Sequence, residues 1–215
     1  MSKTATATHK RRDLTKGSIP KTMLLFALPT LGSSALQSLN GSINAIWVGQ
    51  SLGEEALAAT ANGNILMFIL ISFVFGFGMA STILIGQAMG QRNDSMVKQT
   101  MGTALGSIIP ISILVSAVGW LFAPVLLDLL GTPASAADLA LTYLRMIFIA
   151  MPTTLTFTLI MMALRGTGDS TTPLWFIIIS VVIDLILTPT LILGLGPFPE
   201  WGIFGAAFAT AVANT

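Results

Sequence analysis

Residues 173–194 read Pro-Leu-Trp-Phe-Ile-Ile-Ile-Ser-Val-Val-Ile-Asp-Leu-Ile-Leu-Thr-Pro-Thr-Leu-Ile-Leu-Gly, an apolar stretch with one carboxylate, Asp184, near its middle. At 1.5 Å per helical residue, this stretch is long enough to cross a hydrocarbon core of about 30 Å. Asp184 is then expected near the midplane, where an ionised carboxylate is costly unless it is paired, wetted or protonated. Because intramembrane acids usually mark ion or proton paths, Asp184 is our candidate for ion or proton coupling.

The helix around Asp184 carries two further polar side chains on the same face. Ser180 and Thr188 lie one helical turn to either side, so the three residues form a polar stripe on an Ile, Leu and Val surface. Pro189 has no N–H to donate to the carbonyl of Leu185, which leaves a kink and a free acceptor beside the acid. A buried Asp184 bonded to a neighbouring helix for structure alone is the alternative interpretation.

The composition of the whole chain is that of an integral membrane protein. With 53% hydrophobic and 9% charged residues and a mean hydropathy of +0.84, the chain has too little polar surface to cover a soluble globule. We predict an all-α fold, a polytopic membrane helix bundle, preceded by a basic tail at 1–17. The predicted spans are about 20–48, 60–90, 99–122, 140–164 and 173–194, with an incomplete sixth at 201–215.

The charged residues alternate in sign from one connection to the next. Lysines and arginines precede the first span, Arg92 and Lys98 lie between the second and third, and Arg165 follows the fourth. The other connections carry acids, and their only basic residue is Arg145; the acids are Glu54, Glu55, Asp128, Asp138 and Glu200. By the positive-inside rule we expect a multi-pass protein of the cytoplasmic (inner) membrane with a cytoplasmic N-terminus.

The first span contains three side-chain amides on one face. Gln37, Asn40 and Asn44 follow spacings of three and four residues, so their common face is too polar to meet lipid. Side-chain amides in membranes either hold helices together or line wet cavities. Both interpretations stay open for Gln37 and Asn40, whereas for Asn44, nearer the outer end, we favour the cavity.

The fourth span combines a proline with hydroxyl side chains. Thr154 and Thr158 share a face, although threonine hydroxyls also bond back to helix carbonyls. The methionines of this span are adaptable apolar groups that suit promiscuous binding surfaces, but we interpret them as lipid contacts; they are Met146, Met151, Met161 and Met162. Pro152 interrupts the hydrogen bonding of this span as Pro29 and Pro189 do in theirs, and all three are candidate hinges.

Glycines mark a tight turn and two close-packing stripes. Arg165, Gly166, Gly168 and Asp169 form a cytoplasmic turn in which both glycines admit left-handed backbone and Arg165 can pair with Asp169. Small residues recur every four positions in the second span and at the start of the third, which predicts close approach of neighbouring helices; they are Gly78, Thr82, Gly86 and Gly90, then Gly102 and Gly106.

Several segments in order resemble the multidrug and toxic compound extrusion (MATE) family. The match covers nearly the whole chain after Arg12 and rests on short motifs, which are Phe26-Ala-Leu-Pro29, Trp47-Val-Gly49, Gly86-Gln-Ala-Met-Gly90, Leu164-Arg-Gly-Thr-Gly-Asp169 with Thr172-Pro173, and Gly194-Leu-Gly-Pro-Phe-Pro199. The resemblance implies a carrier of about a dozen helices in two six-helix lobes, exporting organic cations by exchange with protons or sodium ions. This chain, over 18–215, corresponds to the N-terminal lobe with its sixth helix truncated.

The sequence departs from the family's pattern at two positions. The family's first span often has an acid where this chain has Asn44, and its fifth span often has an acid where this chain has Thr188. The coupling carboxylate, Asp184, therefore lies one turn earlier on the same face. The resemblance implies a small organic cation as substrate, the second lobe and membrane lipid as partners, and neither a cofactor, a metal nor nucleic acid.

Other function classes fit the sequence less well. A lipid-linked precursor flippase of similar architecture would line its cavity with basic residues, and the spans contain none except Arg145 at an outer end. An intramembrane enzyme would need paired acids, a Ser with His, or a metal cluster, and the only His is His9 in the tail. A purely structural membrane protein stays open.

Overall fold

The computed structural model describes residues 18–133, 136–194 and 200–213 of the chain. These residues form five α-helices, which are α1 (Ile19–Gly90), α2 (Asp94–Leu129), α3 (Ala137–Gly166), α4 (Thr171–Leu193) and α5 (Gly202–Ala213). The all-α class predicted from the sequence is confirmed. The basic tail at 1–17, with His9, and residues 195–199 lie outside the described residues.

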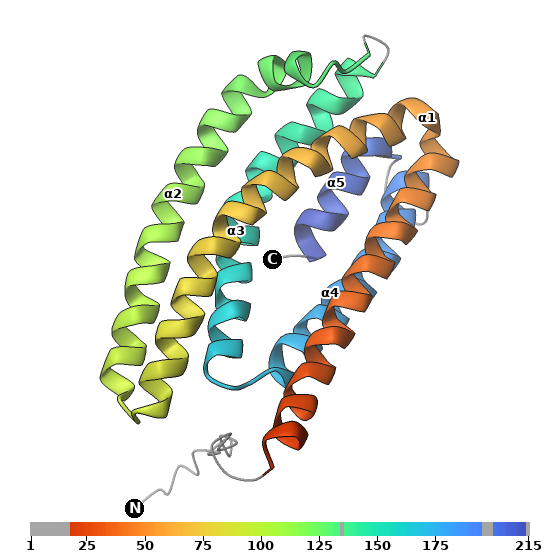
Figure 1. The fold of residues 1–215 in the computed structure, drawn as a ribbon. Helices are drawn as coiled ribbons and strands as arrows, with labels where there is room; N and C mark the ends of the chain where they lie inside the picture. Colours follow the sequence, from red (N-terminus) through yellow and green to blue (C-terminus); the bar gives the residue numbers. More distant parts are fainter. Residues whose placement is uncertain (1–17, 134–135, 195–199, 214–215) are drawn as a thin grey trace, which may run out of the picture.

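Helix α1 is two membrane-length arms joined at a glycine. Its 72 residues would extend about 110 Å if straight, several times the thickness of a bilayer core. Gly53 has φ 85° and ψ −176°, a backbone conformation outside the helical region that side chains with a Cβ rarely adopt. The chain reverses there, so that residues 54–90 run back beside the rest of the bundle (Figure 1). Residues 49–59, which the predicted spans left out, are therefore helical apart from this break.

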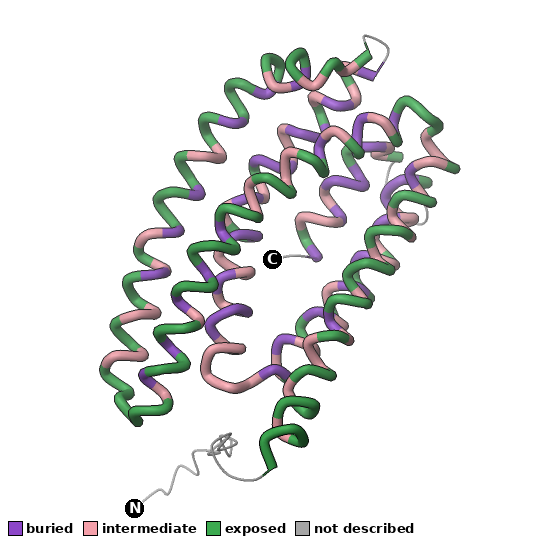
Figure 2. Tube along the Cα trace, viewed as in Figure 1, coloured by how far each residue is buried: buried purple, intermediate pink, exposed green. Residues whose placement is uncertain are grey.

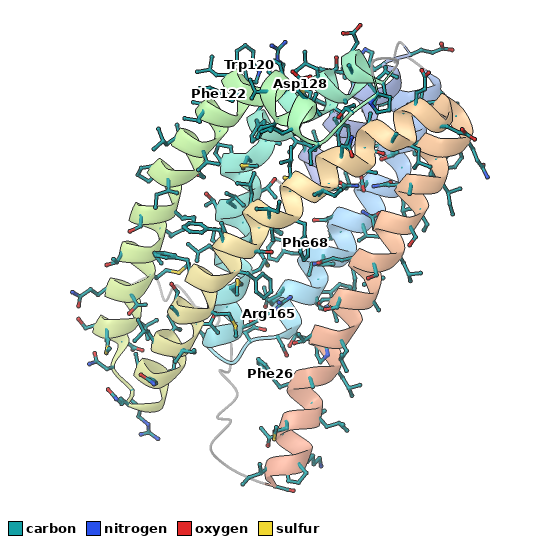
Figure 3. All side chains as sticks on the ribbon, turned by 45° about the horizontal axis from the view of Figure 1, so that its top comes forward. Phe26, Phe68, Trp120, Phe122, Asp128 and Arg165 are labelled. Atoms are coloured by element: carbon teal, nitrogen blue, oxygen red, sulfur yellow. The ribbon has the colours of Figure 1, made fainter. Side chains whose placement is uncertain are left out.

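The helices run alternately between two ends of the bundle (Figure 1). At one end, which we call the basic end, lie Ser18, the turn at 91–93 and the turn at 167–170. At the other, the acidic end, lie the bend between the two arms of α1 and the C-terminal ends of α2 and α4. Figure 3 shows Arg165 towards the basic end and Asp128 at the acidic end. The alternation of charge along the sequence thus becomes a difference between the ends.

Large apolar side chains cover the outside of the bundle. Phe68 is 74% exposed and Leu129 79% exposed, and exposed residues run along α1 and α2 in Figure 2. Such a surface suits lipid tails and not water. Four described helices, α1 to α4, are long and apolar enough to cross a membrane by length and composition. The chain is a multi-pass membrane protein.

Helix α3 is the central helix and is held by close backbone contacts. In the most apolar 18-residue stretch of α3, 50% of the residues are buried inside the bundle, compared with 22% in the corresponding stretches of α1 and α2. Thr82 in α1 donates to the carbonyl oxygen of Met162 at 3.0 Å, and a Cβ added at Gly78 would clash with the Met162 sulfur. The predicted packing stripe in α1 is therefore confirmed at Gly78 and Thr82. The other stripe is wrong, because a Cβ at Gly102 or Gly106 would meet nothing within 4 Å.

The prolines inside α1, α3 and α4 do not end these helices. Pro152 cannot donate to the carbonyl of Phe148, the residue four positions earlier in α3. The hydroxyl of Ser116 in α2 donates to that carbonyl oxygen instead. A Cβ at Gly119, nearly one turn further along α2, would meet the Phe148 ring. The carbonyl that Pro152 leaves without a partner in α3 is thus satisfied from a neighbouring helix, as backbone groups inside a membrane require.

Candidate functional site

The polar stripe on α4 faces the interior of the bundle. Asp184 and Thr188 are each 1% exposed, and the Thr188 hydroxyl donates to Oδ1 of Asp184 at 3.0 Å. Ser180, one turn before Asp184, is half-buried. As the four-residue spacing in the sequence predicts, the Thr188 hydroxyl and the Asp184 carboxylate meet on one face of the same helix.

Two amides from the first arm of α1 complete the surroundings of the carboxylate. Nδ2 of Asn40 donates to Oδ2 of Asp184 at 2.6 Å, and Nδ2 of Asn44 donates to the same oxygen at 2.5 Å. Asp184 thus accepts from three neutral side chains, two of which lie on another helix. Asn44 and Thr188, the two positions at which the chain departs from the MATE pattern, both bond to this one carboxylate.

The same amides leave two acceptors without partners. Oδ1 of Asn40 and Oδ1 of Asn44 are buried and have no hydrogen-bond partner among the described residues. An unsatisfied buried polar atom costs about 1–3 kcal/mol, so such atoms point to a missing donor or cation. The arrangement can accept a proton or a positively charged group beside Asp184.

A cavity of about 430 Å³ opens onto this cluster. Its volume falls in the range typical of sites for drug-sized ligands. The sequence-predicted cavity residues all line it, namely Gln37, Asn40, Asn44, Thr154, Thr158, Ser180 and Thr188, together with Asp184. Asn40 and Asn44 both bridge helices and line the cavity, so the two roles left open for amides coexist at Asn40.

The α3 wall carries hydroxyls and adaptable apolar side chains. Thr154 and Thr158 donate to carbonyls of their own helix, at 3.0 and 2.8 Å, so only their lone pairs are available to the cavity. Met161 and Met162 are buried and line the cavity. Their interpretation as lipid contacts was wrong, because α3 is surrounded by other helices.

The predicted turn after α3 has two glycines with different roles. Gly168 has φ 87° and supplies the left-handed backbone that the turn needs. Gly166 instead makes a close approach to α1, where an added Cβ would lie 2.9 Å from the carbonyl oxygen of Thr82. Asp169 accepts from the backbone N–H groups of Thr171 and Thr172 at 3.0 Å and so caps α4.

Sequence reasoning missed part of the cavity wall. Arg165 was assigned to the turn alone, yet its side chain lines the cavity, and so does Tyr143 near the other end of α3. Tyr143 packs against Gly63, where an added Cβ would lie 2.7 Å from the ring. The spacing of Thr154, Thr158 and Arg165 along one side of a helix was the available signal for Arg165.

The described residues contain no group of three or more His, Cys, Asp or Glu side chains that could hold a metal ion. Among the described residues that line the cavity, Asp184 is the only acid and Arg165 the only base. The chemistry available from these residues is therefore hydrogen bonding and charge pairing, at one carboxylate and one guanidinium.

Comparison with known proteins gives consistent matches. The MatE family model matches residues 29–190. The chain is 40% identical over 199 residues to the probable multidrug resistance protein YoeA of Bacillus subtilis (strain 168), covering 93% of this chain and 43% of that protein. It is 30% identical over 200 residues to an FAD transporter of Shewanella oneidensis, covering 93% and 44%.

Among solved structures, an outward-facing multidrug resistance MATE family transporter of the MOP superfamily superimposes with a TM-score of 0.85. It is 22% identical, and the match covers 95% of this chain and 44% of that chain. The chain therefore spans about half the length of the relatives that it matches.

Proposed function

Because the chain belongs to the MatE family of multidrug efflux transporters, we propose that it forms the N-terminal lobe of an antiporter that exports organic cations in exchange for protons or sodium ions. Proteins of this family are transporters and not enzymes. A second lobe, of similar size, would come from the other half of the protein, since the relatives are about twice as long as the match. The lobe comprises 18–215 after the basic tail.

The observation that carries the proposal is the environment of Asp184. The carboxylate is 1% exposed, accepts from Asn40, Asn44 and Thr188, and borders a cavity of ligand size. A purely structural Asp would need its donors but no cavity. The two unpartnered amide oxygens beside it favour a site that is loaded with a proton or a cation during part of a cycle.

The amides suit a carboxyl group that changes protonation. When Asp184 is ionised, Nδ2 of Asn40 and Asn44 donate to it, as the described geometry has them. When Asp184 carries a proton, its O–H needs an acceptor, and rotation of either amide offers Oδ1. A sodium ion would be held by the same oxygen atoms. An organic cation competes for the same negative charge, so loading of one favours release of the other.

Exchange also requires alternating access. Rocking of the two lobes, with Pro29, Pro152 and Pro189 as hinges within this one, would open the cavity to each side of the membrane in turn. The basic end would be cytoplasmic and the membrane would be the cytoplasmic membrane, because basic residues favour the inner side. Lipid contacts the exposed apolar faces.

The flippase alternative receives less support. A pyrophosphate head group would need several cations, whereas the cavity is lined by one arginine, Arg165, and one acid, Asp184. The predicted spans contain no basic residue except Arg145, but Arg165, directly after the fourth span, lies in the cavity wall. A single cation, in a cavity wall that also contains a buried carboxylate, still disfavours a polyanionic cargo.

The test is Asp184→Asn in the full-length protein. The amide keeps the size of the side chain and part of its hydrogen bonding but does not titrate, so the protein should fold. Export of a cationic dye driven by a proton or sodium gradient in proteoliposomes should fall more than about tenfold. Asp128→Asn is the control, because Asp128 is exposed at the acidic end and does not line the cavity (Figure 3).

Adding Thr188→Asp to Asp184→Asn should restore part of the transport. Thr188 lies on the same face and bonds to Asp184, so its replacement returns a carboxylate to the cluster. Wild-type export by Asp184→Asn, with an unchanged dependence on pH and sodium, would show that Asp184 is structural and that the proposed coupling is wrong.

A further inference from the structure

Among the described residues, Arg165 is the one cation in the cavity wall, and its surroundings leave it available to a ligand. It lies in the last turn of α3, where that helix runs into α4 (Figure 3). The side chain is half-buried and lines the same cavity as Asp184. Its Nε atom is buried, and no residue in the described part of the chain accepts a hydrogen bond from it.

The acid closest in sequence is engaged elsewhere. Asp169 uses Oδ1 to accept from two backbone N–H groups of α4 and Oδ2 to accept from the Thr172 hydroxyl at 2.5 Å. The predicted pairing of Arg165 with Asp169 is therefore replaced by a helix cap. A guanidinium N–H that is buried without an acceptor carries a desolvation cost that an incoming oxyanion would remove.

Arg165 and Asp184 are too far apart to neutralise each other. Asp184 lies about 20 Å along α4 from Thr171, which follows the turn after Arg165. The lining residues that precede Arg165 on α3 include the apolar Phe157, Met161 and Met162, and the Phe157 ring meets that of Phe176 edge to face. The cavity wall therefore has a cation at the turn between α3 and α4, apolar surface beside it, and a carboxylate with hydrogen-bonding amides near the middle of α4.

We propose that Arg165 is a specificity-determining residue that binds an anionic group, such as a carboxylate, on the exported molecule. The cargo is then a dipolar organic ion, with its oxyanion on the guanidinium fork and its cationic group on the side of Asp184. This inference rests on the proposed export function and narrows its substrate class from simple cations to dipolar ions.

The experiment compares two dyes that differ in one charge. A rhodamine with a free carboxylate and its methyl ester have the same aromatic cation, but only the former has an anionic group. Binding of each to purified full-length protein is measured by fluorescence anisotropy. Arg165→Gln should weaken binding of the carboxylate dye about tenfold and leave that of the ester unchanged, as expected for charge-assisted hydrogen bonds. Arg165→Lys keeps the positive charge but not the planar guanidinium fork, so its affinity for the carboxylate dye should lie between those of the wild type and Arg165→Gln.

Arg145→Gln is the matched control. Arg145 is on the same helix, but its guanidinium lies over the Trp120 ring, 4.8 Å from the centroid, and it does not line the cavity. Its replacement should change the affinity for neither dye. Equal losses for both dyes in Arg165→Gln, or no loss for either, would overturn the inference, because a structural role or a contact with the second lobe has no preference for the carboxylate.

Failure of this inference can be told apart from failure of the proposed function. If the wild type exports the ester by a mechanism that Asp184→Asn abolishes, but shows no Arg165-dependent preference for the carboxylate, only the dipolar substrate class is wrong. If the wild type neither binds nor exports either dye, that result counts against both.

Discussion

The side-chain amide of Asn44 donates a hydrogen bond of 2.5 Å to Oδ2 of Asp184, joining residues that lie 140 positions apart in the chain. The bond connects the first arm of α1 to the middle of α4 inside the cavity wall. In the proposed function, a change in the charge of Asp184 would act directly on a second helix through this bond. The bond would then link the protonation of Asp184 to helix packing.

The Asn44–Asp184 pair predicts that the two residues can be exchanged. Asn44→Asp combined with Asp184→Asn keeps one carboxylate and one amide in contact, so gradient-driven dye export should recover a substantial part of the activity that Asp184→Asn loses. Gln37→Glu combined with Asp184→Asn is the control, because Gln37 lines the cavity but does not bond to Asp184. Recovery with Gln37→Glu as well would mean that any acid in the cavity suffices.

The contact of Gly166 with α1 predicts a loss of stability on substitution. In Gly166→Ala the new Cβ would lie 2.9 Å from the carbonyl oxygen of Thr82, a backbone atom that cannot move aside. We expect the free energy of unfolding to fall by about 1–3 kcal/mol, which would be measured as a lower thermal unfolding temperature in detergent. Gly90→Ala, at the end of α1, meets nothing within 4 Å and should unfold like the wild type. Equal behaviour of the two variants would contradict the close approach.

The bond between Ser116 and the Phe148 carbonyl predicts a dependence on Pro152. Ser116→Ala leaves that carbonyl without a donor and should cost about 1–3 kcal/mol. In a Pro152→Ala background, residue 152 regains an N–H that can donate to the same carbonyl, so Ser116→Ala should then cost less than about 1 kcal/mol. Thermal unfolding of the four proteins completes the cycle, and additive effects would exclude the proposed link.

The charge difference between the two ends predicts the orientation in the membrane. The chain has no cysteine, so single cysteines report one position each. Cysteine at Ser51, beside the Gly53 break at the acidic end, should react with an impermeant maleimide added to intact cells. Cysteine at Ser95, near the start of α2 at the basic end, should react only after permeabilisation. The reverse pattern would invert the orientation.

Much of this protein is determined by local sequence. Hydropathy and length identify the membrane-crossing segments, because the free energy of moving an apolar segment into lipid is set mainly by the side chains that it contains. The spacing of Ser180, Asp184 and Thr188 places them on one face for the same local reason, the period of the helix. The carboxylate therefore stands out before any tertiary contact is known.

Only the tertiary structure decides which side of each helix faces the bundle. Lipid tails are as apolar as leucine, so apolar periodicity does not distinguish lipid-facing from buried positions in a membrane helix. For this reason the sequence alone predicts Met161 and Met162 as lipid contacts and Gly102 and Gly106 as packing sites, and the structure contradicts both predictions. The position of Arg165 in the cavity wall could not be predicted for the same reason, because it depends on how α3 packs against α1 and α4. The partners of Asp184 on α1 likewise required two distant segments to be brought side by side.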